Sequence, residues 1–88
     1  MSDRYVQNKE IIQSKIGDEV VMLDIESGYY FGLNSIASDI WHHLKEEISF
    51  NDLLLKLMES YNVEIHICEN DTKSLLSEML AKNIIRKV

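Results

Sequence analysis

Length, composition and charge exclude several classes of protein at the outset. The 88 residues are enough for one small domain with a thin core, and we expect a single domain over residues 1–88. A net charge of −6 repels nucleic acid, one cysteine excludes an internal disulfide, and no apolar run approaches the ~20 residues of a membrane helix.

The first half of the chain carries the pattern of β-strands. Two β-rich runs, residues 11–16 and 19–25, flank a Gly-Asp pair at 17–18 that suits a tight hairpin turn. Residues 26–28 end in a glycine and turn the chain again. Tyr29–Leu33 then follows as a third strand, so the sequence predicts a three-stranded antiparallel sheet.

Two helices are expected after the strands. Asn34 or Ser35 can cap the first, whose apolar residues recur at helical spacing and predict one buried stripe: Ile36, Ala37, Ile40, Trp41 and Leu44. The second begins at Ser49, where S-x-x-D fits a capping box. Its apolar set keeps the same spacing: Phe50, Leu53, Leu54, Leu57, Met58 and Tyr61.

The last third of the chain is ambiguous at its start. Residues 63–68 alternate like a strand but also continue a helical stripe, and we favour a helix over about 65–82. Asn83 tolerates the left-handed conformation that ends such a helix. We expect the tail, residues 84–88, to pack back on the core with Arg86 and Lys87 in solvent.

The candidates for catalysis or metal binding are weak. Adjacent His42 and His43 point about 100° apart on a helix, so the two cannot easily bind the same metal ion. With His66 and Cys68 as the other candidates, the chain then falls short of the four ligands that a structural zinc site usually has. Acidic neighbours of Cys68 disfavour a reactive thiolate. We therefore expect no catalytic residues, metal or cofactor, and a protein that is not an enzyme.

The third predicted strand is the feature that points to a function. A three-stranded sheet has two edges with unpaired N–H and C=O groups, which proteins normally block with charges or proline. Tyr29–Leu33 contains neither. The residues alone leave open whether this edge pairs with another chain, is covered, or forms a homodimer.

Three segments of the chain resemble the family of the coenzyme PQQ synthesis protein D: GDEVVMLDIESGYYFGLNSIASDIW, FNDLLLKLMESYNVE and DTKSLLSEMLAKNII. Its members are also called RiPP recognition elements, after the ribosomally made, modified peptides whose precursors they bind. The resemblance covers about residues 11–85 and includes the Asp24-x-x-x-Gly28 turn and Trp41. Two departures are Asn83, where the family often has glycine, and the unusually apolar EIHICEN before the third helix.

The resemblance implies an α+β fold similar to a winged helix-turn-helix, with three antiparallel strands followed by three helices. It also implies that the leader of a precursor peptide adds as a strand to the third strand and lies against the third helix. The residues matching this peptide-binding site are Tyr29, Tyr30, Phe31, Gly32, Leu33, Cys68, Asp71, Thr72, Leu75 and Leu76. As a small free-standing member, this chain looks like those encoded with lasso-peptide precursors. Such members deliver the leader to a leader peptidase or another maturation enzyme.

Two alternatives accompany this interpretation. A PQQ-type peptide chaperone for a radical SAM enzyme is the alternative within the family. A winged-helix DNA-binding regulator is disfavoured, because residues 64–82 contain four acidic and two basic residues. Without a signal-peptide pattern we expect the cytoplasm, with no nucleic acid or membrane as partner.

Overall fold

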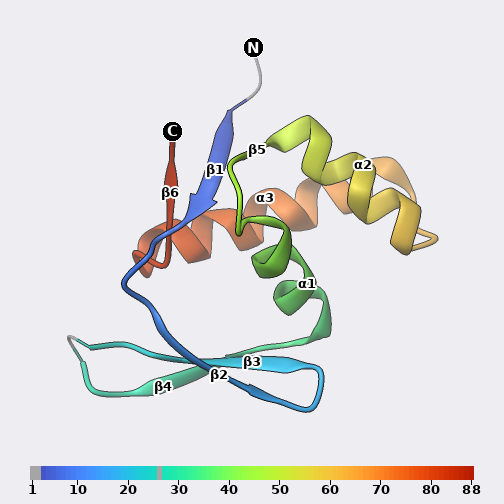
Figure 1. Ribbon diagram of the computed structural model, residues 1–88. Coiled ribbons are helices and arrows are strands. Elements are labelled where there is room, and N and C mark those ends of the chain that lie inside the picture. The colour runs from blue at the N-terminus through green and yellow to red at the C-terminus, as the bar shows by residue number, and fades with distance from the viewer. Residues whose placement is uncertain (1–2, 26) are drawn as a thin grey trace.

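The computed structural model describes residues 3–25 and 27–88, which form two small antiparallel sheets and three helices (Figure 1). The predicted α+β class is confirmed, as are the three consecutive strands followed by three helices. In chain order the elements are β1 (Arg4–Gln7), β2 (Ile12–Ile16), β3 (Glu19–Leu23), β4 (Tyr30–Leu33), α1 (Ser35–His43), β5 (Ile48–Ser49), α2 (Phe50–Ser60), α3 (Ile65–Ala81) and β6 (Ile85–Lys87).

The predicted sheet has the order β2-β3-β4, with both pairs antiparallel. Gly17 and Gly28 have φ of 62° and 76°, and the Gly28 N–H donates to the Asp24 carbonyl at 2.8 Å. Glu26, which we placed in the second turn, lies outside the described residues. The prediction that the second strand reaches Ile25 is wrong, because the chain already turns after Leu23 and leaves Ile25 exposed.

The second sheet has the order β5-β1-β6, and sequence patterns did not predict it. The strands are short: β1 has four residues, β5 has two and β6 has three. They come from both ends and the middle of the chain. In Figure 1 β1, near the start of the chain, and β6, near its end, lie side by side in this sheet. The tail does pack back on the core as predicted, with Ile84 and Ile85 buried and Arg86 and Lys87 exposed.

Side-chain caps fix the helix boundaries that the sequence predicted. The Asn34 side chain accepts from the Ala37 N–H at 2.9 Å, and the Ser49 hydroxyl accepts from the Asp52 N–H at 3.1 Å. Asn83 has φ of 59° and ends the third helix in the left-handed region. The prediction for Ile36 is wrong: it is 52% exposed rather than part of the buried stripe of α1.

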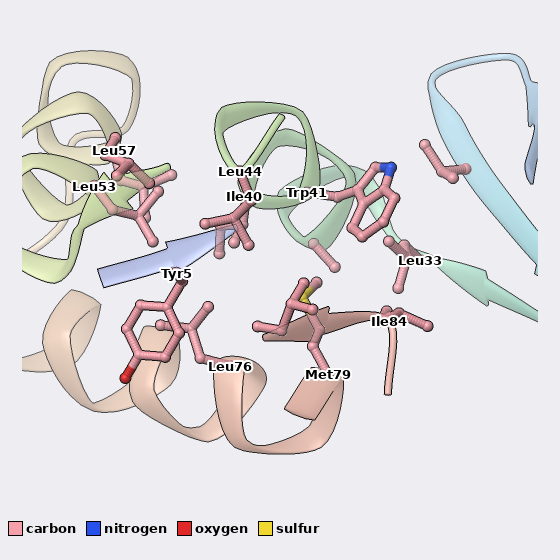
Figure 2. Packing of buried hydrophobic residues seen from close by; sticks show 14 of the residues in the cluster. Tyr5, Leu33, Ile40, Trp41, Leu44, Leu53, Leu57, Leu76, Met79 and Ile84 are labelled. Carbon is pink, nitrogen blue, oxygen red and sulfur yellow. The ribbon is translucent and has the colours of Figure 1, made fainter. Parts of the chain in front are cut away.

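The core is centred on α1, and Figure 2 shows Trp41 and Leu44 of that helix among residues of both other helices and of the strands. The Trp41 indole N–H donates to the Gln13 side chain at 2.9 Å, and the Gln7 amide donates to the Trp41 carbonyl at 2.6 Å. Gln7 lies in β1 and Gln13 in β2, so Trp41 connects α1 to both sheets.

Ser38 holds the end of β4 against α1. Its hydroxyl is fully buried, accepts from the Val20 N–H and donates to the Leu33 carbonyl, both at 3.0 Å. Val20 and Leu33 are register partners at the end of the β3–β4 ladder. The position of the sheet edge relative to α1 is therefore set by a buried polar contact.

Residues 3–25 and 27–88 contain neither a membrane-spanning helix nor a cluster of metal-binding side chains. No helix there is both long and apolar enough to cross a bilayer. No group of three or more His, Cys, Asp or Glu side chains in that part of the chain could hold a metal ion. Cys68 is a buried thiol whose Sγ lies 4.0 Å from the Thr72 hydroxyl.

Candidate functional site

Strand β4 forms one edge of its sheet, and within the described residues it pairs only with β3. The Asp24 N–H donates to the Tyr29 carbonyl at 2.9 Å, which makes these two residues a hydrogen-bonded pair. Such pairs alternate with non-hydrogen-bonded pairs along an antiparallel ladder. The backbone N–H and C=O groups of Tyr30 and Gly32 are therefore directed to the open edge, while those of Phe31 face β3.

The side chains of β4 leave space beside this edge. Tyr29 and Tyr30 are 76% and 69% exposed, whereas Phe31 is half-buried and Leu33 is buried in the core. A Cβ atom built on Gly32 would meet nothing within 4 Å. The face of the sheet at Gly32 is therefore not crowded by the other described residues.

A groove of about 370 Å³ begins where β4 ends and lies between α1 and α3. We call it the α1–α3 groove. Its floor consists of residues that are at least 90% buried: Ile40, Leu57, Cys68 and Thr72. Its apolar rim is formed by Ile36, Val63 and Ile67, which are 52%, 40% and 57% exposed. Exposed aliphatic side chains around a hollow are typical of a binding surface.

The structure brings together four of the five helix residues that the resemblance implied. Cys68, Asp71, Thr72 and Leu75 all line the α1–α3 groove. Leu76 does not line it and packs in the core instead. The five strand residues lie at the adjacent sheet edge rather than in the groove wall, to which Asn34, directly after β4, contributes. Their role in binding stays a prediction.

Three residues of the groove rim were missed by sequence reasoning. Ile36 was assigned to the core, since its spacing from Ile40 fits the same helical stripe. Ile67 belongs to EIHICEN, the segment whose apolar character departs from the family pattern, and Val63 directly precedes that segment. That departure was the available signal: aliphatic residues at the start of a helix that does not bury them are free to contact a ligand.

The far end of β4 also lies close to α3. The Lys82 ammonium, at the end of α3, is 5.0 Å from the centroid of the Phe31 ring. A second hollow of about 270 Å³ is lined by both residues, with Ile11 and Ile84 among its other walls. The third helix therefore lines two hollows: the α1–α3 groove, which begins after β4 ends, and this second one, which its last residue Ala81 shares with Phe31 of β4.

Tyr61 holds the wall of the α1–α3 groove that comes from α2. Its hydroxyl donates to the Asp39 carboxylate of α1, and both side chains are partly buried. The hydrogen bond to Asp39, with smaller effects of burial and of the Asp39 charge, raises the pKa of Tyr61 above its ordinary value. The hydrogen bond from this hydroxyl fixes the end of α2 against α1.

This contact gives the stability of the fold a dependence on alkaline pH. A raised pKa in the folded state means stability that is complete below about pH 10, the unfolded pKa, and is lost as pH rises through the folded value. Tyr61→Phe should lower the free energy of unfolding by about 1 kcal/mol at pH 7. Urea unfolding from pH 7 to 11 should show the two proteins converging, and a constant difference would contradict the assignment.

The chain matches one family model and is similar in fold to two solved proteins. The family model for coenzyme PQQ synthesis protein D (PqqD) matches residues 19–85. TbiB1 in complex with the TbiA(beta) leader peptide aligns with a TM-score of 0.81 and 27% identity, covering 92% of this chain and 94% of that one. Lasso peptide synthetase B1 complexed with the leader peptide aligns with a TM-score of 0.79 and 27% identity, covering 93% and 96%. No curated protein matches the sequence.

Proposed function

The chain belongs to the coenzyme PQQ synthesis protein D family, and from this membership we propose that it is a leader-binding module, a RiPP recognition element, of a lasso-peptide pathway. It captures the leader of a ribosomally made precursor peptide and performs no catalysis itself. The peptide adds as a strand to β4 and inserts side chains into the α1–α3 groove. Both similar structures, at 27% identity over more than nine-tenths of this chain, are complexes with leader peptides.

The observation that carries this proposal is an open strand edge that runs into an apolar groove. Tyr30 and Gly32 present unpaired backbone groups, which give affinity for almost any extended peptide. The groove beside them accepts particular side chains and so supplies specificity. A protein with one of these features alone would hold a peptide weakly or without selection.

The energetics of this binding mode are sufficient for a reversible complex. Two peptide side chains that bury ~100–150 Å² each contribute roughly 5–7 kcal/mol at ~25 cal/mol/Å². Ordering a disordered leader costs ~2–5 kcal/mol, and hydrogen bonds to the edge offset that cost. We expect a Kd between micromolar and tens of nanomolar, which allows the leader to be released later.

Release implies a second partner. We infer that the loaded protein delivers the leader to a maturation enzyme, with a leader peptidase as the first candidate and the cytoplasm as the place. The name of one similar structure, lasso peptide synthetase B1, refers to lasso-peptide assembly and supports this candidate. A DNA-binding role gains no support, because the exposed carboxylates of Asp71 and Glu78 would face the phosphates.

A titration with amide exchange tests the proposed function. The leader of the precursor encoded beside this protein is labelled with fluorescein, and its anisotropy is followed as protein is added. We expect saturable binding, with slower hydrogen exchange at Tyr30 and Gly32 and little change at Phe31, whose N–H already faces β3. Absence of binding at ~100 micromolar would refute the function.

The same experiment separates the proposed site from its alternatives. Binding that leaves the exchange of Tyr30 and Gly32 unchanged would place the peptide elsewhere. A homodimer through the β4 edge would protect the same two amides without any peptide. The mass in solution, measured with and without the leader, therefore accompanies the exchange data.

A further inference from the structure

Two carboxylates flank the middle of the α1–α3 groove. Asp71 and Glu78 both line it and both are exposed. Seven residues are close to two full turns of an α-helix, so the two side chains lie on the same face of α3. Leu75 lies between them, half-buried at the groove wall. The wall of the groove along α3 thus presents a carboxylate, an aliphatic side chain and a second carboxylate in a row.

These two carboxylates form no ion pair within residues 3–25 and 27–88. Neither Asp71 nor Glu78 has an ion-pair partner among the described residues, and no basic side chain in that part of the chain lines the groove. The two lysines of this region are engaged elsewhere. Lys73 contacts the Glu69 carboxylate at 3.2 Å, and Lys82 lies over the ring of Phe31.

We propose that the α1–α3 groove selects leaders that carry a lysine or arginine next to an aliphatic anchor. This inference rests on the leader-binding function proposed above. The aliphatic side chain enters the apolar hollow beside Leu75, and the neighbouring cation lies between Asp71 and Glu78. The methylene stem of a lysine or arginine can also cover the exposed rim residue Ile67.

Charge complementarity decides between the possible occupants of the groove. An acidic or neutral peptide could fill the hollow, but it would meet two unpaired carboxylates in a protein whose net charge is −6. A second copy of this chain would bring the same negative charge. A basic peptide gains at short range from the two carboxylates and at long range from faster encounter.

The test combines neutral variants of the groove with neutral variants of the leader. The protein carries Asp71→Asn and Glu78→Gln, singly and together, and the labelled leader has each Lys or Arg near its anchor changed to Gln. The control is Glu59→Gln, which removes an equal charge from an exposed position of α2 outside the groove. Anisotropy gives the Kd at 50 and 300 mM salt.

Each groove substitution should raise the Kd about threefold at low salt, the size expected for an exposed charge pair. The neutral leader should lose the same affinity, and the combined loss should be smaller than the product of the separate losses. Glu59→Gln should change the Kd by less than about twofold. Higher salt should reduce the difference between wild type and variants.

The proposal is overturned if the groove variants bind as the wild type does, or if Glu59→Gln has an equal effect. A leader without Lys or Arg near its anchor also overturns it. In each of these cases binding itself, with protection of Tyr30 and Gly32, leaves the proposed function intact. Absence of binding by every protein and peptide overturns both.

Discussion

Replacing Gly32 with proline should weaken leader binding about 100-fold while the protein stays folded. The Gly32 N–H faces the open edge, so proline removes a donor that no group of the sheet uses. Proline is tolerated on edge strands in this orientation. The proline ring also replaces the N–H hydrogen with a carbon atom that projects toward the open edge, where a guest strand would lie. Anisotropy with the labelled leader measures the loss, and circular dichroism verifies the fold.

A matched proline on the opposite edge provides the control. Strand β2 is the other edge of the same sheet, and by the same alternation the Lys15 N–H faces away from β3. Lys15→Pro should therefore bind the leader with an unchanged Kd. Equal losses for the two variants would mean that proline damages the sheet in general, and unchanged binding by Gly32→Pro would exclude strand addition at β4.

Local sequence signals were sufficient for the elements that position the candidate site. The hairpin depends on Gly17, and the turn before β4 depends on Gly28, and both glycines have the positive φ that the pattern predicted. The caps at Asn34 and Ser49 act through neighbouring backbone groups, which a single sequence reveals. Each of these features depends on interactions within about four residues, so local sequence patterns predict it.

The second sheet and the groove could not be predicted in the same way. Strand β1 has four residues and pairs with β5 and β6, more than 40 residues away, so no local pattern distinguishes it from a loop. Ser38 reads as an ordinary helix residue, yet it bridges Val20 and Leu33 inside the core. Ile36 keeps the helical spacing of a buried residue and is exposed because α3 stays apart from it across the groove.

Helix α1 combines a locally predictable start with long-range packing. One side of it forms part of the groove, and the other lies at the centre of the core. Ile36 and Ile40 contribute to the groove, and Trp41, one residue later, packs in the core. The groove therefore keeps its shape only while α1 is held against both sheets. A chain with one cysteine forms no internal disulfide, so the groove depends on this packing for its geometry.

The second expected result follows from that dependence: Trp41→Ala should lower the free energy of unfolding by about 3–5 kcal/mol. Trp41 is 1% exposed and bonds through its indole to Gln13 of β2 and through its carbonyl to Gln7 of β1. A domain of this length has roughly 4–13 kcal/mol of stability in all, at ~0.05–0.15 kcal/mol per residue. The loss corresponds to a fall in Tm of about 12–40 °C, since ~4–8 °C accompany each kcal/mol at this size. Far-UV circular dichroism is the measurement, because the variant lacks the only tryptophan of the chain.

Two further variants serve as comparisons for Trp41→Ala. One removes the indole hydrogen bond but keeps an aromatic ring, and the other removes an exposed side chain from a helix. Trp41→Phe keeps most of the buried ring but loses the N–H that Gln13 accepts, so about 1–2 kcal/mol should be lost. Leu55→Ala removes an aliphatic side chain that is 62% exposed, and it should change stability by less than ~0.5 kcal/mol. Saturating leader should raise the Tm of Trp41→Ala, because it binds only the folded state with an intact groove. A loss below ~1 kcal/mol in Trp41→Ala would show that α1 is held by other contacts, and the link between this core residue and the groove would then fail.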